Sequence, residues 1–262
     1  MAEVPVLQAE NEGLTYLLLA CRRGFRYACG MEPIAHIHTD LPTKFGVPRQ
    51  CGLVEALKGR IVFTPKYREP EALRGLEDFT HIWLIWEFSR AVRNEWSPTV
   101  RPPRLGGNVR MGVFATRSPF RPNFLGLSCV RLECVNLHGS EGPELYVAGV
   151  DLMDGTPIFD IKPYVPYSDS HPEAKGGFTT RLADRILHVD FPDIFRRKFS
   201  REQQEAIVGI LERDPRPHYH TDPERVYGMP FAGYDIRFCV RDNVAEVREV
   251  TALEKQEKES RQ

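Results

Sequence analysis

A series of short apolar segments separated by turn residues constrains the fold of this chain more than any other feature. The segments follow one another from residue 34 to residue 164, with turn signals such as Gly106-Gly107 and Asp154-Gly155 between them. This pattern is typical of β-barrels and β-sandwiches, in which tight turns join many short strands. We predict strands around Ile34 and Ile37 and over residues 60–64, 79–88, 111–115, 125–134, 145–152 and 157–164.

The same region contains two more specific signals. Residues 81–88 (HIWLIWEF) are apolar almost throughout, which predicts a strand that is buried on both faces. One short helix over residues 70–76 is predicted to interrupt the strands, since Pro70 suits the first turn of a helix. The sequence therefore predicts a mainly β domain over residues 30–168.

The end of the chain predicts a small α+β domain over residues 185–254. Ser200 and Gln203 have the spacing of a capping box, and an apolar stripe follows them at helical spacing. Asp242-Asn243 can turn a strand over residues 234–241 back into one over 244–250. The stripe consists of Ala206, Ile207, Ile210 and Leu211. The other segments are interpreted as an N-terminal extension (1–29), a linker (169–184) and a charged tail (255–262).

Charge is balanced overall but unevenly distributed. The 35 Lys and Arg match 36 Asp and Glu, so global charge indicates no polyanionic partner. Between Glu95 and Glu133, however, the chain has six arginines and no acid, and residues 141–169 have six acids against Lys162 alone. This distribution indicates a surface with two differently charged roles, and the alternative is ordinary surface charge.

Other patterns bear on compartment and metals. No apolar run approaches the roughly 18 residues of a membrane span, and residues 14–21 lack the flanks of an export signal. The six cysteines form no C-x-x-C pair, and His218 and His220 lack a nearby third ligand. We therefore expect a cytoplasmic protein with reduced thiols, no membrane partner and no metal site.

The most informative stretch runs from residue 101 to residue 128. Pro102, Pro103, Pro119 and Pro122 stiffen it, so that Arg117, Arg121 and Asn123 can be held in fixed directions. A rigid loop with guanidinium groups suits recognition of a carboxylate or a phosphate. The alternative is a stiffened barrel corner with solvated arginines.

This stretch also carries a family resemblance. Residues 112–128 (GVFATRSPFRPNFLGLS) resemble the signature of the TsaA-like, or TrmO, tRNA methyltransferases. Five more stretches match in order: 45–50 (FGVPRQ), 75–83 (GLEDFTHIW), 151–164 (DLMDGTPIFDIKPY), 214–219 (DPRPHY) and 234–238 (YDIRF). The resemblance implies a closed β-barrel that binds S-adenosyl-L-methionine near a homodimer interface. The absence of a G-x-G-x-x-G after a strand independently disfavours a Rossmann cofactor site.

The resemblance also implies which residues form the cofactor site. Arg49 or Arg117 can bind the cofactor's carboxylate, and Asp151 or Asp154 can accept from its ammonium or ribose diol. Taken without the resemblance, Asp154-Gly155 is a plain hairpin turn. The family often has a histidine and a polar residue where this chain has Ser89-Arg90. The implied positions are Pro48, Arg49, Gln50, Ser89, Arg90, Arg117, Leu127, Asp151, Leu152, Met153 and Asp154.

The substrate implied by the resemblance is threonylcarbamoyladenosine at position 37 of tRNA, next to the anticodon, methylated at N6. The N6 proton must leave, and Asp160 and Tyr219 are candidate bases. Anticodon-loop bases can stack on aromatic rings, and phosphates can bind the arginine segment. Expected substrate contacts are Arg121, Asn123, Arg216 and Tyr219. Candidate stacking rings, each also compatible with a place in the core, are Phe120, Phe124, Tyr164, Tyr167 and Tyr219.

Two other classes of function fit the same residues. One is a cofactor-sensing RNA-binding barrel without turnover, and the other is a methyltransferase for a small metabolite. Transfer of labelled methyl to RNA separates the enzyme from the sensor, and label transfer without RNA indicates the metabolite enzyme. A hydrolase is disfavoured because neither G-x-S-x-G nor H-E-x-x-H occurs.

Overall fold

The computed structural model of the chain describes residues 31–91, 95–181, 186–217 and 222–254. The chain divides into two compact units, residues 1–32 and residues 33–262, and every element named below belongs to the second. The extension over 1–29, the tail over 255–262 and the candidate base Tyr219 lie outside the described residues.

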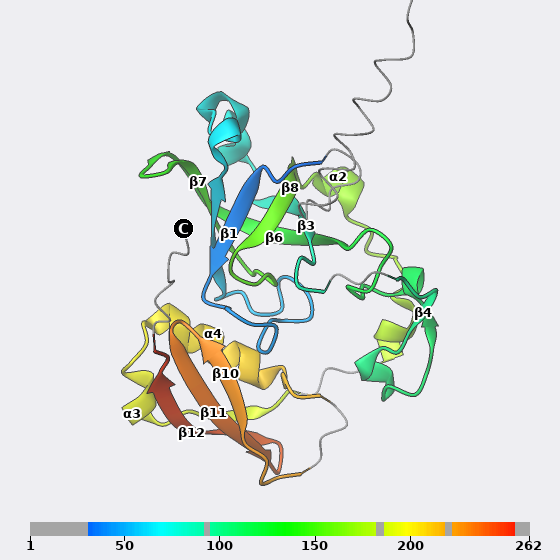
Figure 1. Cartoon of the computed structure of the whole chain (residues 1–262), viewed down its shortest axis with the longest axis vertical. Coiled ribbons are helices and arrows are strands. Elements are labelled where there is room, and N and C mark those ends of the chain that lie inside the picture. Colours follow the sequence, from blue (N-terminus) through cyan, green and yellow to red (C-terminus); the bar gives the residue numbers. More distant parts are fainter. Residues whose placement is uncertain (1–30, 92–94, 182–185, 218–221, 255–262) are drawn as a thin grey trace, which may run out of the picture. The chain divides into compact units, whose positions relative to one another are not determined.

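Six strands close into a barrel in the order β1-β2-β7-β6-β3-β8 (Figure 1). Every neighbouring pair in this order is antiparallel. The strands are β1 Ala35–Thr39, β2 Lys58–Phe63, β3 His81–Glu87, β6 Leu125–Gly139, β7 Gly142–Ala148 and β8 Thr156–Pro163. Closure pairs both edges of every strand, which removes the free edges of an open sheet. The barrel prediction is confirmed, and the sandwich alternative is wrong.

Alternation along β3 gives the barrel one packed face. Ile82, Leu84 and Trp86 are buried in the interior, whereas the residues between them are only half-buried on the outer face. The prediction that residues 81–88 are buried on both faces is therefore wrong. The outer face of this strand carries apolar Trp83 and Ile85 between the polar residues His81 and Glu87.

Two predicted elements between the barrel strands differ from the structure. The expected helix over 70–76 is two 3₁₀ turns, Pro70–Leu73 and Leu76–Asp78, separated at Gly75, whose φ of 81° is left-handed. The expected strand over 111–115 is only β5, Met111–Gly112, followed by a 3₁₀ turn over Val113–Ala115. β5 pairs with β4, Thr99–Val100, in a separate two-stranded sheet. Three further 3₁₀ turns are Pro65–Tyr67, Pro103–Leu105 and Gly177–Arg181, and α2 is Pro166–Asp169.

The C-terminal part forms a second sheet packed on one main helix. Its strand order is β10-β11-β12-β9, with β9 parallel to β12. The elements are β9 His188–Asp190, α3 Asp193–Arg196, α4 Arg201–Glu212, β10 Tyr227–Phe231, β11 Tyr234–Arg241 and β12 Val244–Ala252. The predicted capping box of Ser200 and Gln203 is confirmed at the start of α4, and the whole apolar stripe of α4 is buried. Asp242 and Asn243 have φ of 48° and 65°, so the predicted tight hairpin is also confirmed.

The loop between β1 and β2 packs against this second sheet. Phe45 stacks on Tyr227 with ring centroids 6.3 Å apart, and Val54 meets α4 at Gly209. Gln203 of α4 donates to Asp40 at 3.0 Å. Through these contacts, the second sheet and α4 hold the β1–β2 loop, which carries residues 48–50, in place. Within the described residues, no helix combines the length and the apolarity that crossing a membrane requires.

Candidate functional site

A cavity of about 1870 Å³ opens beside the start of β6. Three segments form most of its wall: the β1–β2 loop, the arginine-rich segment that carries β4 and β5, and the first residues of β6. Asp151, on the loop between β7 and β8, adds a carboxylate to the wall. The segments are residues 44–54, residues 95–121 and residues 125–127, with further contributions from residues 175–179 and 210–215.

A chain of two hydrogen bonds holds the Asp151 carboxylate. The indole N–H of Trp86 donates to Ser128 Oγ at 2.9 Å, and that hydroxyl donates to Asp151 Oδ1 at 2.6 Å. Ser128 is fully buried, so both of its bonds are satisfied inside the protein. The carboxylate is therefore oriented by interior groups before any ligand arrives.

Burial of Asp151 raises the pKa of its carboxyl group. The bond from Ser128 and the nearby charge of Arg117 oppose this shift but do not cancel it. A desolvated carboxylate gains more from a cationic ligand than a solvated one, because the ligand replaces the missing water. Asp151 is thus suited to receive an ammonium group or a pair of hydroxyls.

Arg117 and Gln50 meet in the same cavity. A guanidinium N–H of Arg117 donates to Gln50 Oε1, and Gln50 Nε2 donates to the carbonyl of Arg49. Arg49 in turn donates through Nη2 to the carbonyl of Asp214 at 3.2 Å. The Arg117 guanidinium is thus held by a neutral oxygen atom, which leaves its charge available to an anionic ligand, and Arg49 lies in the same wall.

Two cysteines tie the β1–β2 loop to the barrel. The backbone N–H of Cys129 on β6 donates to Cys51 Sγ at 3.2 Å, next to a backbone bond between Gly52 and Gly149 of 2.8 Å. Burial raises the pKa of the Cys51 thiol and raises that of Cys129 to about 11. Both thiols are therefore protonated near neutral pH, which argues for a structural role and against a nucleophile.

The structure brings some of the predicted site residues together and leaves others elsewhere. The predicted residues that line the cavity are Pro48, Arg49, Gln50, Arg117, Arg121, Leu127 and Asp151. The predicted residues that do not line it are Ser89, Arg90, Asn123, Leu152, Met153, Asp154, Asp160 and Arg216.

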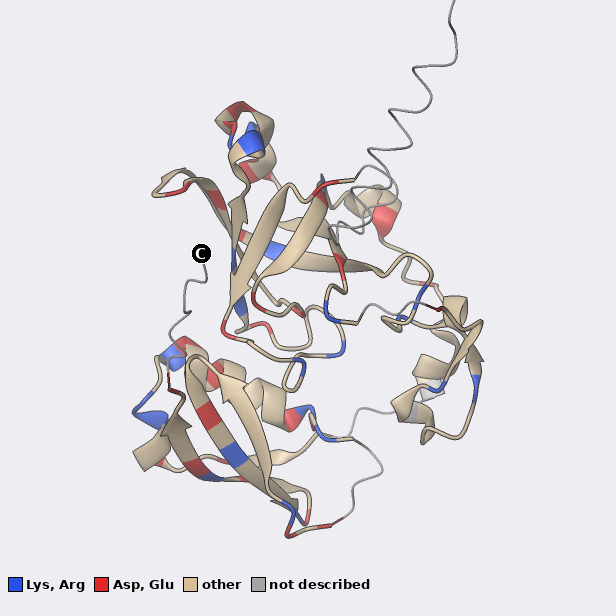
Figure 2. Ribbon diagram, in the orientation of Figure 1, with Lys and Arg blue, Asp and Glu red and all other residues tan. Residues whose placement is uncertain are grey.

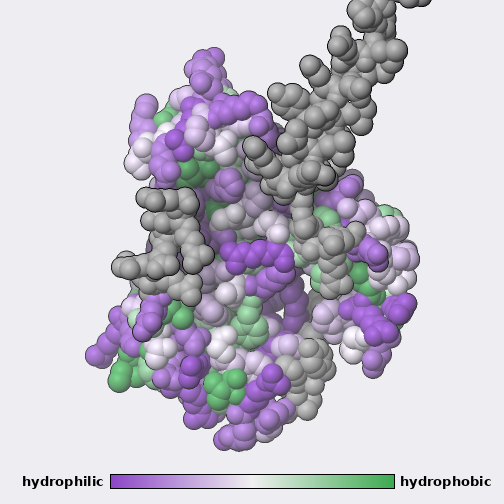
Figure 3. All heavy atoms as spheres, viewed as in Figure 1, coloured by the Kyte–Doolittle hydropathy of each residue, from purple (hydrophilic) through white to green (hydrophobic). Residues whose placement is uncertain are grey.

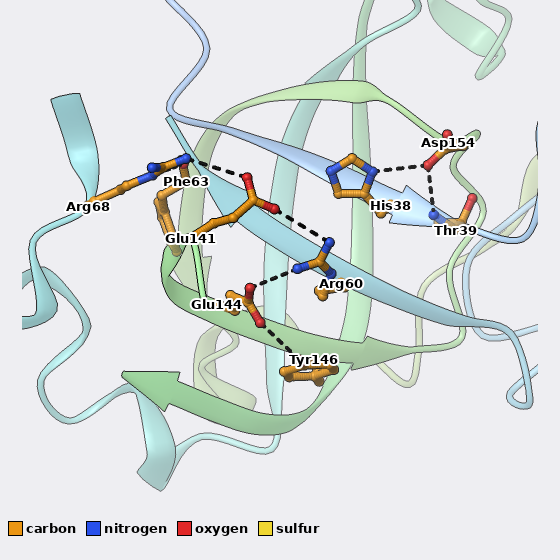
Figure 4. A network of polar contacts seen from close by, with 9 residues as sticks. All are labelled: His38, Thr39, Arg60, Phe63, Arg68, Glu141, Glu144, Tyr146 and Asp154. Atoms are coloured by element: carbon orange, nitrogen blue, oxygen red, sulfur yellow. Dashed lines mark hydrogen bonds and ion pairs between the residues drawn. The ribbon is translucent and has the colours of Figure 1, made fainter. Parts of the chain in front are cut away.

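Asp154 supports strand β1. Its Oδ1 accepts from the backbone N–H of Thr39 at 3.2 Å and lies 3.3 Å from His38 Nδ1 (Figure 4). The carbonyl of Leu152 accepts from Thr39 Oγ1, and that of Met153 from Thr156 Oγ1. Leu152 and Asp154 thus hold the end of β1 and do not line the cavity. Figure 4 also shows a neighbouring network in which Arg60 bridges Glu141 and Glu144, and these three residues do not line the cavity either.

Arg90 contacts the same loop that carries residues 48–50. Its guanidinium donates to the carbonyl of Pro42 at 3.2 Å, and its own carbonyl accepts from Lys44 Nζ at 2.8 Å. Ser89 precedes it, with its backbone N–H bonded to the carbonyl of Glu87. Arg90 therefore holds the loop that carries residues 48–50, and neither Arg90 nor Ser89 lines the cavity itself.

Several residues expected to take part in substrate binding or catalysis have structural partners. Arg216 forms two bonds to the Asp214 carboxylate, at 2.7 and 2.9 Å, and its side chain is only 11% exposed. Arg121 donates to the carbonyls of Thr116 at 2.6 Å and Val113 at 3.3 Å. Asp160 lies on the outer face of the barrel, 2.9 Å from Lys162 Nζ. Asn123 is exposed outside the cavity wall.

Trp86, Ser128 and Cys51 belong to this site but were not predicted from the sequence. A usable signal existed for Ser128. Because side chains alternate along a strand, Gly126 and Ser128 must face away from the side that Leu127 occupies. The part of the wall around Asp151 combines its carboxylate with the guanidinium group of Arg117 and the apolar side chain of Leu127, which complements a zwitterionic ligand with a nonpolar part. In the described parts of the chain, no three side chains among His, Cys, Asp and Glu cluster in a way that holds a metal ion.

Comparison with known proteins agrees with this architecture. The family model of the tRNA-methyltransferase O N-terminal domain matches residues 36–170, and that of the TrmO C-terminal domain matches residues 184–253. A tRNA (adenine(37)-N6)-methyltransferase of Escherichia coli is 39% identical over 82% of this chain and 95% of that protein. A putative S-adenosylmethionine-dependent methyltransferase RcsF of Pseudomonas aeruginosa is 40% identical over 79% of this chain and 91% of that protein.

A solved structure extends the likeness to three dimensions. The crystal structure of TrmO from Pseudomonas aeruginosa superposes with a TM-score of 0.68 at 34% identity, covering 85% of this chain and 98% of that one. Both parts of the fold and the order of the quoted motifs are accounted for by one family. The chain belongs to the TrmO family of tRNA methyltransferases.

Proposed function

We propose that this protein transfers a methyl group from S-adenosylmethionine to N6 of adenosine 37 in tRNA, and that the adenosine carries a threonylcarbamoyl group. The names of the relatives support the reaction and the cofactor. The observation that carries the proposal is the cavity in which the Asp151 carboxylate lies close enough to Arg117 for that charge to act on it.

The residues of the cavity fit the proposed cofactor. Asp151 would accept from its ammonium or from its ribose hydroxyls, and Arg49 or Arg117 would bind its carboxylate. Leu127 and the ring of Phe88 supply apolar wall for an adenine. When bound, the cofactor would supply an electrophilic methyl group.

The protein's task in this reaction is alignment. Methyl transfer is an in-line displacement at carbon, so holding the acceptor nitrogen behind the methyl group accounts for much of the acceleration. The hydrogen bonds that fix Asp151 and Gln50 before the ligands bind serve this purpose. The N6 proton of the acceptor leaves during transfer, and the sequence suggests Asp160 and Tyr219 as bases, of which Asp160 does not line the cavity.

Substitution of Asp160 tests one of these bases. We expect Asp160→Asn to change kcat less than about threefold at saturating cofactor and tRNA, because its carboxylate is paired with Lys162 and does not line the cavity. A fall of kcat by 100-fold or more, with KM unchanged, would instead assign the base role to Asp160. Tyr219→Phe, measured in parallel, gives the corresponding test for the other candidate.

The experiment that tests the proposed function is methyl transfer by the purified protein. The reaction contains labelled cofactor and tRNA from cells that lack this gene, and nucleoside mass spectrometry identifies the product. Label at N6 of position 37 supports the proposal. Cofactor and RNA binding without any transfer indicates the cofactor-sensing barrel, and label in a product formed without RNA indicates a small-metabolite enzyme.

Affinity for tRNA is expected to depend steeply on salt. The acid-free segment presents exposed Arg101, Arg110 and Arg117 around the cavity, and each phosphate contact releases condensed counterions. With three contacts to single-stranded RNA, the slope of log K against log salt concentration should be about −2. Filter binding at several salt concentrations measures the slope, and a flat response contradicts phosphate binding by this segment.

Three organisational features complete the proposal. The division into a barrel domain (30–168), a linker (169–184) and a C-terminal domain (185–254) is supported by the two matched family ranges. Homodimerisation is supported by the exposed Leu127 and its neighbour Ile85 on the outer face of the barrel, and sedimentation equilibrium tests it. A cytoplasmic location follows from the proposed substrate.

A further inference from the structure

Two aromatic side chains stand exposed beside the cavity. Phe114 is 74% exposed and Trp96 is 53% exposed, and their rings stack with centroids 6.4 Å apart at an interplanar angle of 29°. Large rings usually bury most of their surface, so an exposed stacked pair points to a ligand. Of the rings that the sequence suggested for stacking, Phe120, Phe124 and Tyr164 are half-buried, whereas Tyr167 is 93% exposed but does not line the cavity.

The backbone around the pair is held in place by local contacts. Trp96 precedes β4 and Phe114 follows β5, so the short β4–β5 sheet brings the two rings together. The N–H of Val113 donates to the carbonyl of Pro98 at 2.9 Å, which closes the segment next to both rings. Arg121 bonds to the carbonyl of Thr116 and approaches the Phe114 ring to 6.0 Å. The pair is therefore preorganised.

The surroundings of the pair are mainly cationic. Glu95 precedes Trp96 and lines the cavity, but no acid occurs from Trp96 to Leu132, and lysine or arginine marks the ribbon near β4 in Figure 2. Exposed Arg101 and Arg110, from the same segment, line the cavity together with Phe114. Hydrophobic atoms lie among hydrophilic ones over the β4 region in Figure 3, as expected for a ligand with both a ring face and charge.

We propose that Trp96 and Phe114 form a platform on which an unstacked base of single-stranded tRNA stacks, while the neighbouring arginines bind the adjoining phosphates. This inference rests on the proposed function and names how its substrate is held. The two rings already contact each other, so the base stacks on the outside of the pair. An apolar protein segment is disfavoured as the occupant, because Arg121 lies beside the Phe114 ring and the exposed Arg101 and Arg110 line the same cavity.

The test compares substitutions that keep apolar bulk with ones that keep the ring. Trp96→Leu and Phe114→Leu preserve an apolar side chain but remove the π face, and each is expected to raise the Kd for tRNA about 10-fold. Trp96→Phe and Phe114→Tyr are expected to stay within about threefold of the wild type. Ile194→Ala, a 71% exposed apolar residue on α3, is the matched control and should leave the Kd unchanged.

Two further readouts separate stacking from a structural effect. The leucine variants should have the same Kd for S-adenosylmethionine as the wild type. They should also show the same salt slope of tRNA binding, whereas Arg110→Gln should reduce the magnitude of that slope by about 0.7. Trp96 is the exposed one of the chain's three tryptophans, so a stacked base should quench its fluorescence. The quenching should be lost in Trp96→Phe.

The outcomes are distinct from those of the methyl-transfer test. Leucine variants that bind tRNA as tightly as the wild type overturn the platform, even if the wild type methylates tRNA normally. Equal losses in the leucine and the aromatic variants also overturn it, because bulk or folding then explains the effect. If the wild type transfers no methyl to tRNA, the proposed function fails independently of how these variants bind RNA.

Discussion

Replacing Asp151 with asparagine is expected to raise the Kd for S-adenosylmethionine about 30-fold while the protein stays folded. Asparagine retains an oxygen that accepts the hydrogen bond from Ser128, so the interior contacts of the site remain. What is lost is a charge-assisted bond from the ligand's ammonium or hydroxyls, worth about 2 kcal/mol. Isothermal titration calorimetry of the purified variant measures the change directly.

Measurements of thermal stability distinguish the loss of a ligand contact from a loss of folding in this variant. Because burial raises the pKa of Asp151, the charged form is disfavoured in the folded protein without ligand. Removing the charge should therefore leave the Tm of the free protein unchanged or higher, while the rise in Tm on adding cofactor becomes smaller. A lower Tm of the free variant would mean that the loss of affinity comes from unfolding.

The same carboxylate gives the cofactor affinity a pH dependence. Only ionised Asp151 attracts a cation, so affinity should fall as pH falls through the raised pKa, at a pH above the usual range of aspartate. The Asp151→Asn variant should lack this dependence. Asp154→Asn is the matched comparison, and we expect a change below about threefold, because Asp154 bonds to Thr39 and His38 instead of lining the cavity. Equal losses in the two variants contradict this assignment.

Much of the fold could be predicted because its signals are local. The capping box at Ser200 and the turn at Asp242-Asn243 depend only on neighbouring residues, and both occur where the sequence indicated. The strand over 111–115 failed because apolar composition does not reveal that β5 has only a two-residue partner in β4. Pairing partners far apart in sequence decide where a strand ends.

Charge patterning indicated the site only in part. The arginine-rich segment and an acidic segment do meet, and Arg117 lies near Asp151. Yet acids that are close in sequence have separate tasks, since Asp154 holds β1 and Asp160 pairs with Lys162. Likewise, Arg216 in a polar loop suggested a ligand contact, but two bonds to Asp214 occupy it. A sequence gives the type of each side chain, whereas the direction in which it points depends on the closed barrel.

The largest expected structural effect comes from adding a single methyl group at Gly126. A Cβ at this position would lie 2.3 Å from Cε2 and 2.5 Å from Cζ2 of Trp86. The indole is buried in the closed barrel and bonded to Ser128, so it cannot move aside cheaply. We expect Gly126→Ala to destabilise the protein by about 3 kcal/mol and to lower the Tm by roughly 6–12 °C.

The effect should extend to the cofactor, because the displaced ring belongs to the chain that orients Asp151. Movement of Trp86 breaks its bond to Ser128 and frees the hydroxyl that holds the carboxylate. Cofactor affinity should therefore fall in Gly126→Ala even at temperatures where the variant is fully folded. Gly112→Ala, in the same motif, is the control: its φ is −56° and an added Cβ meets nothing within 4 Å, so stability should change by less than about 0.5 kcal/mol.

A double-mutant cycle decides whether the indole is the cause. Phenylalanine at position 86 lacks part of the ring system that the new methyl group would strike, so Gly126→Ala should cost less in a Trp86→Phe background than in the wild type. An interaction energy of about 1 kcal/mol or more, measured by denaturant unfolding of the four proteins, supports a direct clash. Strict additivity would mean that the alanine acts on the backbone of β6 and not through Trp86, and the coupling of this ring to Asp151 would then have to be abandoned.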